Sequence, residues 1–288
     1  MKYHLIVGFG KWSKKNLDYL RNKKKLKNIV IKTRDKFIYP NLKVLSKVDN
    51  NKIIKKIDTI HICTPVESHF KYLKKFKHLK KVIVEKPIVK KKTELNLIKK
   101  IYKKRYLVVN YIDTFNPIIN KAESFLKKNK FNKIVLNYSK RENFYKKKYD
   151  FANEWLDHPL SLILLFFKKF GKLEITRHKI NKKGKLYNQT IVINYKYLKF
   201  VIIVNLNNSN NIQRNIQFFN KKNTYTFHFY KNSIYKNNLK IFQSKLNSFD
   251  IFYKSIKANK KNLFQNLKTH EKIFLEKEKI IKKLKINF

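Results

Sequence analysis

Two kinds of hydrophobic pattern divide the chain. In the first 110 residues, short apolar runs alternate with lysine-rich stretches whose apolar residues recur at helical spacing. Uninterrupted apolar runs are typical of strands buried on both faces, and their alternation with helices predicts a parallel sheet. The predicted strands are Tyr3–Val7, Asn28–Lys32, Asp58–Cys63, Lys81–Val84 and Tyr106–Val109.

The pattern changes after Asn116-Pro117 and a predicted amphipathic helix over Ile118–Lys128. From there apolar and polar residues alternate strictly, which predicts an antiparallel sheet with one face toward water. Gly184 and the Asn-rich segment Asn207–Asn211 mark turns between strands. The predicted strands are Lys133–Ser139, Glu174–Ile180, Leu186–Tyr195, Leu198–Leu206, Ile212–Asn220 and Thr224–Tyr230, and the predicted helices are Leu239–Lys257 and Thr269–Lys285.

Two of the four glycines, Gly8 and Gly10, follow the first predicted strand and precede a helix. A glycine pair in this position lets backbone N–H groups approach a diphosphate at the helix N-terminus. A tight strand-to-helix turn that binds nothing is the equally weighted alternative from these residues alone. We therefore predict an α/β chain with a Rossmann dinucleotide-binding domain over residues 1–117. An α+β domain with a large, mostly antiparallel sheet follows over residues 118–288.

The net charge of +52 first suggests a nucleic-acid binder. However, only six of the 70 basic residues are arginine, and the lysines are spread along the whole chain. Lys, Asn, Ile, Phe and Tyr dominate and Ala and Gly are rare, which is typical of AT-rich codons. A solvated lysine surface accounts for this composition, and no specific nucleic-acid partner is expected.

The single cysteine, Cys63, lies in a predicted apolar strand and is expected to be a buried, inert thiol. One cysteine excludes an internal disulfide and suits a reducing compartment. The histidines lack metal-ligand spacing, so no metal site is expected. The apolar run at the N-terminus ends at Val7, unlike a signal peptide, and the apolar, uncharged stretch Pro159–Phe167 is too short for a bilayer. These features predict a cytoplasmic protein without a membrane segment.

Three further stretches carry candidate chemistry, and each also has a structural interpretation. The stretch DTIHICTPVESHF (58–70) ends a strand at Thr64-Pro65, and His69 then opens a helix or merely lies at its terminus. The stretch KVIVEKPIV (81–89) holds Lys86 between a strand and a proline, although Lys86 alone resembles any surface lysine. The stretch NEWLDHPLSLILLF (153–166) sets Glu154 and His158 on one helix face, where they could equally serve as first-turn residues.

The order of these motifs resembles the glucose–fructose oxidoreductase / inositol dehydrogenase / rhizopine-catabolism (Gfo/Idh/MocA) family of NAD(P)-dependent oxidoreductases. The resemblance spans nearly the whole chain, and Glu-Lys-Pro after a strand is its most specific part. The stretches GFGKWSKKNLDYLRN, TFNPIINKAESFLKK and YSKRENF look most similar to the sugar-nucleotide 3-dehydrogenase branch.

The resemblance implies a role for each matched residue. Lys86 would hydrogen-bond the reacting oxygen, His158 would be the general acid/base, and Glu154 would replace the family's aspartate four residues earlier. Asp157 is a second candidate for the role of Glu154. The implied cofactor contacts are Gly8, Gly10, Lys11, Trp12, Ser13, Thr33, Arg34, Thr64, Pro65, His69, Glu85 and Lys86, and the implied substrate contacts are Asn116, Arg141, Asn143 and Asp157.

The pattern departs from the family at two places. Ser13 stands where the third glycine of the fingerprint is expected, and it can still donate at the helix N-terminus. After the second strand the usual acid for the adenosine ribose is replaced by Thr33-Arg34, which suits a 2′-phosphate, so the implied cofactor is NAD or NADP.

The sequence thus predicts hydride transfer between a nicotinamide cofactor and a secondary alcohol or ketone of a sugar or sugar nucleotide. A histidine titrating near neutrality suits the proton transfer, and a fixed ammonium suits the developing oxyanion. A non-catalytic relative acting as a ligand sensor or scaffold is the alternative, and a basic nucleic-acid binder is a third. The resemblance and the large C-terminal sheet, which too few helices can cover, also predict a homodimer or homotetramer.

Overall fold

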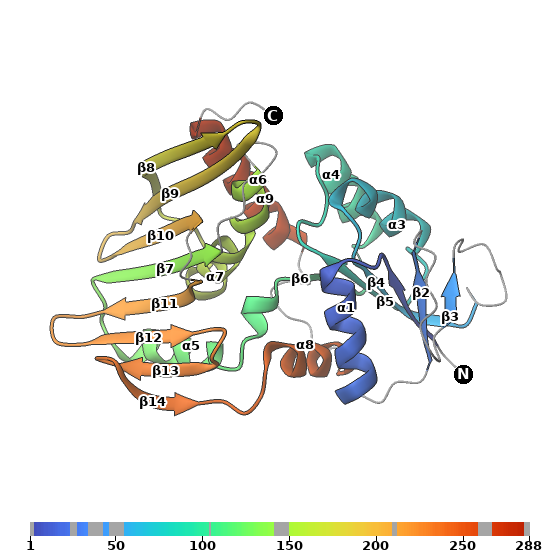
Figure 1. Ribbon diagram of the computed structural model, residues 1–288, viewed down its shortest axis with the longest axis horizontal. Coiled ribbons are helices and arrows are strands. Elements are labelled where there is room, and N and C mark those ends of the chain that lie inside the picture. The colour runs from blue at the N-terminus through green and yellow to red at the C-terminus, as the bar shows by residue number, and fades with distance from the viewer. Residues whose placement is uncertain are drawn as a thin grey trace. The chain divides into compact units, whose positions relative to one another are not determined.

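The computed structural model describes residues 3–23, 28–33, 43–45, 55–103, 105–140, 150–208, 212–258 and 267–284 (Figure 1). The chain forms two compact units. The first combines Met1–Tyr111 with Tyr253–Glu271, and the second combines Ile112–Phe252 with Lys272–Phe288. The segment after Phe252 therefore contributes to both units, so each unit is built from two separate stretches of the chain. No helix in the described residues has the length and apolarity needed to span a bilayer.

The first unit contains a six-stranded parallel sheet in the order β3-β2-β1-β4-β5-β6, the doubly wound order of dinucleotide-binding domains. The predicted Rossmann domain is confirmed, although β3 was not predicted because it has only three residues. The strands are β1 (Tyr3–Val7), β2 (Ile29–Lys32), β3 (Lys43–Leu45), β4 (Ile57–Ile62), β5 (Lys81–Glu85) and β6 (Leu107–Asn110).

Helices follow the strands of this sheet, as the alternating pattern predicted. Most side chains along β1, β4 and β5 are buried, because successive positions face the two packed sides of the sheet. The helical elements are α1 (Lys11–Asp18), η1 (Tyr19–Lys23), η2 (Val66–Ser68), α3 (His69–Lys75), α4 (Lys92–Ile101), α8 (Ser248–Lys257) and α9 (Leu267–Lys283), of which α8 and α9 each cross a boundary between the units.

The second unit contains an eight-stranded sheet in the order β14-β13-β12-β11-β7-β10-β9-β8. Neighbouring strands run antiparallel except β7 and β10, so the predicted mostly antiparallel sheet is confirmed. The strands are β7 (Lys133–Lys140), β8 (Lys172–Lys183), β9 (Leu186–Lys196), β10 (Val201–Asn208), β11 (Arg214–Phe219), β12 (Thr224–His228), β13 (Ser233–Lys236) and β14 (Leu239–Gln243).

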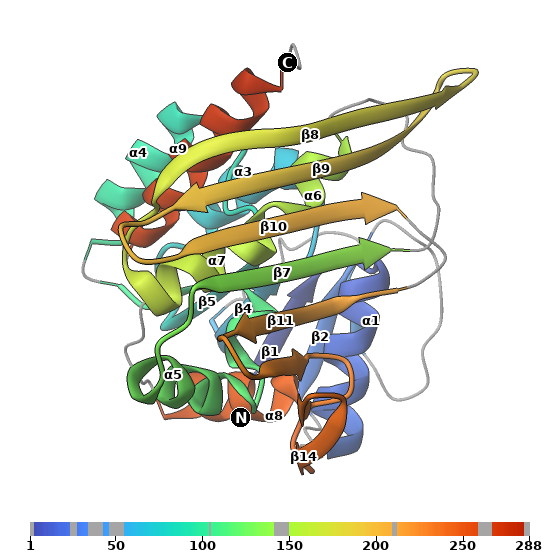
Figure 2. The same ribbon diagram turned by 90° about the vertical axis from the view of Figure 1, so that its left-hand side faces the viewer.

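One face of this sheet is packed and the other carries no helix. Figure 2 shows the helix-free face toward the viewer. Alternate residues such as Leu136, Val204 and Ile216 point to the packed face and are 0–1% exposed. Helices of the same unit are η3 (Ile112–Phe115), α5 (Ile119–Lys128), α6 (Asp150–Trp155) and α7 (Asp157–Phe167).

The prediction of one helix over Leu239–Lys257 was wrong for its first part, which forms β14. Asn237 and Asn238 adopt positive φ angles of 47° and 69°, and such asparagine pairs favour a tight hairpin between β13 and β14. The helix begins only at Ser248, where Asn247 and Asp250 exchange two backbone-to-side-chain hydrogen bonds of 2.9 and 3.1 Å. This reciprocal capping is the local signal that separates the strand from the helix.

Gly8 allows β1 to lie against the end of β4. Its φ is +95°, and a Cβ atom built on it would lie 2.7 Å from the carbonyl oxygen of Cys63. Gly10, two residues later, has an ordinary φ of −78°, and a Cβ atom there would meet nothing within 4 Å. Of these two positions, only position 8 therefore requires glycine.

We expect Gly8→Ala to lower the free energy of unfolding by about 1–3 kcal/mol, because both the backbone angle and the contact with Cys63 are strained by a side chain. Urea unfolding followed by circular dichroism measures this change. Gly10→Ala is the matched control and should cost less than about 1 kcal/mol, since it only weakens a helix N-cap. Equal losses in the two variants would contradict this account of Gly8.

Candidate active site

The carboxyl ends of β1 and β4 form the first part of the site. Gly10 is the N-cap of α1, and no side chain in the described residues caps the helix there. The first backbone N–H groups of the helix, together with the open space beside Gly10, suit a bound anion such as a diphosphate. This geometry fits the dinucleotide that the sequence predicts.

Three residues after Gly10 complete the turn. Lys11 is exposed, and Trp12 is half-buried with the Nζ atom of Lys15 lying 5.0 Å from the centre of its ring. Ser13 is fully buried, and its hydroxyl donates to the Gly10 carbonyl oxygen at 2.7 Å. The serine in place of the third fingerprint glycine therefore directs its hydroxyl into the helix start rather than toward a ligand.

Some predicted site residues lie outside the described residues, namely Arg34, Arg141 and Asn143. Thr33 ends β2 and is 7% exposed.

The turn after β4 is fixed to the turn after β5 by His69. This imidazole is 1% exposed, with Nε2 lying 2.8 Å from the Thr64 carbonyl oxygen and Nδ1 lying 2.9 Å from that of Pro87. Burial lowers the pKa of His69, against the effect of the two carbonyl oxygens. Because both ring nitrogens face backbone, the side chain of His69 positions these two turns rather than facing a ligand.

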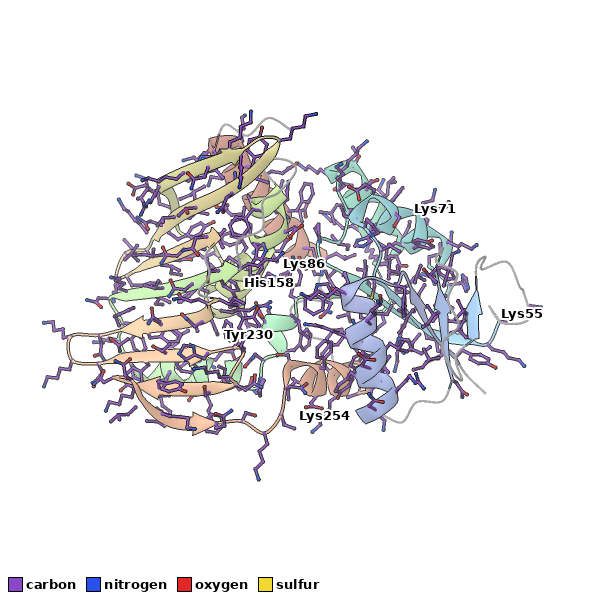
Figure 3. All side chains as sticks on the ribbon, in the orientation of Figure 1. Lys55, Lys71, Lys86, His158, Tyr230 and Lys254 are labelled. Atoms are coloured by element: carbon purple, nitrogen blue, oxygen red, sulfur yellow. The ribbon has the colours of Figure 1, made fainter. Side chains whose placement is uncertain are left out.

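Lys86 lies directly after β5, and the Lys86–Pro87 peptide bond is cis (Figure 3). The lysine is partly exposed, whereas the preceding Glu85 is buried. Pro65, which follows the β4 turn, is exposed. The structure thus brings Thr64, His69 and Lys86 to the same carboxyl edge of the sheet, as the motifs predicted.

Glu85 belongs to a chain of buried polar groups that reaches α1. Its Oε1 atom lies 3.1 Å from Nε2 of His61 and accepts a hydrogen bond of 2.8 Å from Asn110. The other nitrogen of His61 lies 3.3 Å from the Tyr253 hydroxyl, which donates to Asn16 at 2.7 Å. The Tyr253 hydroxyl therefore links the imidazole of His61 to the side chain of Asn16 on α1.

His61, Glu85 and Cys63 also bring their ligand atoms within 4.8 Å of one another, a set that could hold a metal ion. No local motif indicates this set, because Glu85 is 24 residues from His61. The hydrogen bonds just described already engage His61 and Glu85. Burial and the nearby Glu85 raise the pKa of Cys63, so the thiol form of this ligand is favoured.

His158 is the centre of a second polar cluster, built within the second unit (Figure 3). It lies in the first turn of α7 and is 5% exposed. Its Nδ1 atom lies 3.0 Å from Asp113 of η3 and 2.8 Å from Nη2 of Arg214 on β11. The ring of Tyr138 on β7 stacks on the imidazole at a centroid distance of 5.8 Å.

Asp113 is held as a carboxylate by this cluster. Burial acts against its ionised form, but Arg214 and His158 outweigh burial and lower the pKa of Asp113 below its ordinary value. The Tyr138 hydroxyl donates to the same carboxylate at 3.0 Å, and burial together with Asp113 raises the pKa of Tyr138. The cluster therefore presents an imidazole between a fixed negative and a fixed positive charge.

Three other predicted residues lie differently. Glu154 is exposed on α6, so the carboxylate that lies at hydrogen-bond distance from His158 is Asp113. Asp157 is 2% exposed and pairs with Lys277 of α9 at 2.8 Å. Asn116 is 4% exposed and donates to the Phe229 carbonyl oxygen at 3.0 Å. Asp157 and Asn116 thus join elements of the second unit. From the sequence, both residues were assigned to substrate contact.

Sequence reasoning missed Asp113, Tyr138 and Arg214. Asp113 and Arg214 are 101 residues apart, and no local motif links them. The one available signal was arginine itself: in a chain with six arginines among 70 basic residues, Arg214 on an apolar strand is an unusual choice.

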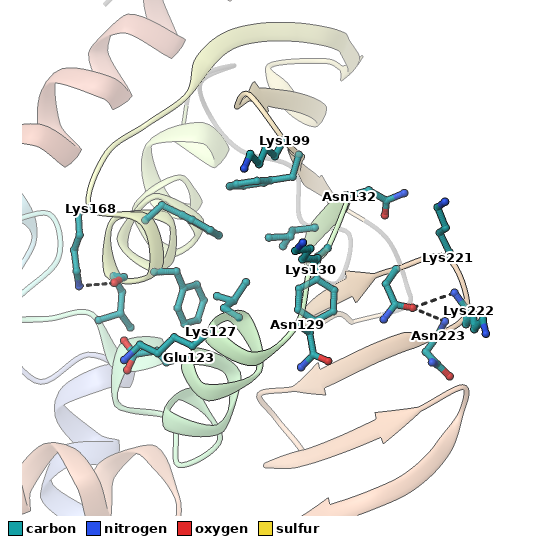
Figure 4. A pocket seen from close by; sticks show the side chains of 18 residues that line it. Glu123, Lys127, Asn129, Lys130, Asn132, Lys168, Lys199, Lys221, Lys222 and Asn223 are labelled. Carbon is teal, nitrogen blue, oxygen red and sulfur yellow. Dashed lines mark hydrogen bonds between the residues drawn. The ribbon is translucent and has the colours of Figure 1, made fainter.

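A cavity of about 1180 Å³ lies elsewhere in the second unit, and none of the predicted site residues lines it (Figure 4). Half-buried apolar side chains such as Phe131, Phe167 and Phe200 share its wall with six lysines and Glu123. None of these groups titrates near neutral pH in its ordinary state, so the cavity lacks the acid/base chemistry that His158 offers.

Residues 3–111 match the family model GFO_IDH_MocA, described as an oxidoreductase family with an NAD-binding Rossmann fold. This match confirms the resemblance that the motifs indicated and agrees with the expected cofactor, NAD or NADP. No curated protein matches the sequence at a significant level.

Solved structures share the fold of the whole chain. A dehydrogenase from Clostridium difficile is 16% identical with a TM-score of 0.76, covering 98% of this chain and 99% of that one. A UDP-N-acetylglucosamine 3-dehydrogenase from Acidithiobacillus ferrooxidans is 12% identical with a TM-score of 0.73, covering 97% of each chain. A Gfo/Idh/MocA family oxidoreductase from Vibrio cholerae is 15% identical with a TM-score of 0.72, covering 99% of this chain and 100% of that one.

Proposed function

The Rossmann domain belongs to the Gfo/Idh/MocA family of NAD-binding oxidoreductases, and from this premise we propose that the chain is a sugar or sugar-nucleotide dehydrogenase. It would transfer a hydride between a nicotinamide cofactor, NAD or NADP, and a secondary alcohol or ketone of the substrate. The similarity in fold to a UDP-N-acetylglucosamine 3-dehydrogenase supports this substrate class. The single cysteine suits a reducing compartment, and the proposal includes a cytoplasmic location.

The observation that carries the proposal is the buried contact between His158 and Asp113 at 3.0 Å. Burying an imidazole with an ion pair costs desolvation free energy that packing alone does not require. Such a group, with an ordinary pKa near neutrality, is suited to moving a proton. A protein that kept only the fold as a sensor or scaffold would have no need of this arrangement.

In the proposed reaction, the chain binds, orients and exchanges one proton. The backbone N–H groups after Gly10 hold the diphosphate, and Glu85 fixes the strand end from which Lys86 projects. The bound nicotinamide supplies the hydride chemistry. His158 takes the hydroxyl proton during oxidation or returns it during reduction, and the ammonium group of Lys86 stabilises the negative charge that develops on the reacting oxygen.

The helix-free face of the large sheet supports the homo-oligomer that we propose. Side-chain amides on this face bond to one another; for example, Asn205 donates to the Oδ1 atom of Asn137 at 2.8 Å. The Oδ1 atoms of Asn194 and Asn207 are buried and have no hydrogen-bond partner in the described residues. Like charges oppose association, so the central part of this face, where the paired strands carry no lysine, favours self-contact. The central part of this face on the four inner strands includes Val135, Asn137, Ser139, Thr190, Val192, Asn194, Ile203, Asn205, Asn207, Asn215, Gln217 and Phe219. Lys133 and Lys196 flank Val201 at one end of the same face.

We expect Gly10→Val to weaken NADH and NADPH binding about tenfold or more, a loss of about 1.4 kcal/mol, because its branched side chain enters the open space beside the helix N-terminus. Fluorescence titration measures the affinity, and circular dichroism checks the fold. A folded Gly10→Val protein with unchanged affinity for both cofactors would contradict the assignment of the turn.

Lys86→Met and His158→Asn should each lower turnover about 100-fold or more, because each removes a group that acts on the reacting oxygen or its proton. The rate is followed by nicotinamide absorbance with a panel of sugar nucleotides. Lys90→Met, an exposed lysine in a 3.7 Å surface ion pair, is the matched control and should change turnover less than about twofold. Cofactor binding without turnover on any substrate by the unmodified protein would favour the sensor or scaffold instead.

Asn205→Lys should shift the protein toward monomer in light scattering at micromolar concentration, because it places a charge in the central part of the face, where the paired strands carry no lysine. Leu198→Lys adds the same charge at an exposed turn and should leave the assembly unchanged. A monomeric unmodified protein would overturn the proposed oligomer.

A further inference from the structure

We propose that Asp113 and Arg214 are positioning residues that fix which nitrogen of His158 exchanges the substrate proton. This proposal rests on the proposed function. In it, Asp113 accepts the Nδ1 proton of His158, and Nε2, which lies 3.4 Å from Nη2 of Arg214, is the nitrogen that takes the hydroxyl proton. Arg214 holds the Asp113 carboxylate in place.

The geometry around Asp113 is that of a carboxylate clamped from several sides. Arg214 bonds it with two nitrogens, Nε to Oδ2 at 2.9 Å and Nη2 to Oδ1 at 2.7 Å. The Tyr138 hydroxyl donates to Oδ2 at 3.0 Å, the same distance at which Nδ1 of His158 faces that oxygen. Asp113 and Arg214 are only 3% and 8% exposed, so water does not weaken these bonds.

Two neighbours compete for Nδ1 of His158. A proton on Nδ1 is donated to Asp113, whereas a bare Nδ1 would accept from Nη2 of Arg214 at 2.8 Å. Nη2 of Arg214 already donates to Oδ1 of Asp113, and a bare nitrogen would face a full negative charge on Oδ2. The proton on Nδ1 relieves that repulsion, so the carboxylate decides the tautomer.

The same charges act on the imidazolium in opposite directions. Asp113 stabilises it, Arg214 destabilises it, and Tyr138 stacks on the ring with its hydroxyl bonded to Asp113. Among the described residues, a neighbouring charged pair is Asp157 with Lys277 of α9, and Trp155 of α6 is a further aromatic group, 5.6 Å from the imidazole centre. Removing one member of the Asp113–Arg214 pair should therefore move the protonation of His158 in a direction set by the sign of the charge removed.

The kinetic test compares pH–rate profiles for alcohol oxidation, in which neutral His158 is the active form. Asp113→Asn should lower kcat about 100-fold or more, because the wrong tautomer is then favoured, and should move the acidic limb to lower pH. Arg214→Gln should move that limb to higher pH, and Arg214→Lys, which keeps the charge, should move it less. The proposal would be overturned if the acidic limb moved in the same direction in Asp113→Asn and Arg214→Gln, or if it moved in neither variant.

Carboxylate-to-amide controls separate this role from a general loss of charge. Glu174→Gln changes an exposed carboxylate paired with Lys196 on the same sheet and should alter neither kcat nor the profile. A loss confined to Glu154→Gln, with Asp113→Asn near normal, would overturn the assignment. Should Arg214→Gln not fold, Asp113→Asn and Arg214→Lys test the proposal without it.

A measurement without turnover distinguishes this proposal from the proposed function. In protein with ¹⁵N-labelled histidine, the two ring nitrogens of His158 have different shifts in each tautomer, and His158→Asn identifies its signals among the eight histidines. We expect the proton on Nδ1 in the unmodified protein and on Nε2 in Asp113→Asn. A proton on Nε2 in the unmodified protein would overturn the proposal even in an active enzyme, and the expected tautomer would support it even where no substrate is turned over.

Discussion

The contact between the end of β1 and the end of β4 is the constraint on which the first unit depends. Only a glycine at position 8 allows the backbone to pass the Cys63 carbonyl oxygen at this distance. The approach places two turns, 55 residues apart in the sequence, at one carboxyl edge where the strand order reverses. The N-terminus of α1 and the turn at Thr64 share that edge, and His69 then ties the turn after β5 to it. A packing requirement thus produces the arrangement that a dinucleotide needs.

The many lysines make the overall composition a poor guide to function, whereas the charged residues in the interior are more informative. Surface lysines contribute little to stability and can accumulate without penalty. At the buried carboxylate of Asp113 the chain uses one of its few arginines, Arg214, which bonds both oxygens and keeps its charge. Lysine is likewise missing from the central part of the open sheet face. Deviations from the average composition are therefore more informative here than the net charge.

Features encoded by residues close together in the sequence were mostly predicted, and contacts between residues far apart in the sequence were not. Apolar runs, the glycine turn and the motif order predicted both sheets and the edge that holds Thr64 and Lys86, because these features are encoded within a few residues. The β13–β14 hairpin was missed although Asn237-Asn238 encoded it locally. Asp113 with Arg214 and His61 with Tyr253 could not be found, since 101 and 192 residues separate the partners and no local pattern records such pairs.

Both candidate reactive groups adjoin a buried, hydrogen-bonded carboxylate. Glu85, joined to His61 and Asn110, directly precedes Lys86, and Asp113, joined to Arg214 and Tyr138, contacts His158. A reactive side chain that projects from such an anchor loses less conformational freedom when a substrate binds, so more of the interaction free energy remains for the transition state. The desolvation cost of two buried carboxylates is then explained by orientation rather than by stability. On this view, the motifs mark the proposed reactive side chains, and the hydrogen bonds that hold the carboxylates beside them join residues far apart in the sequence.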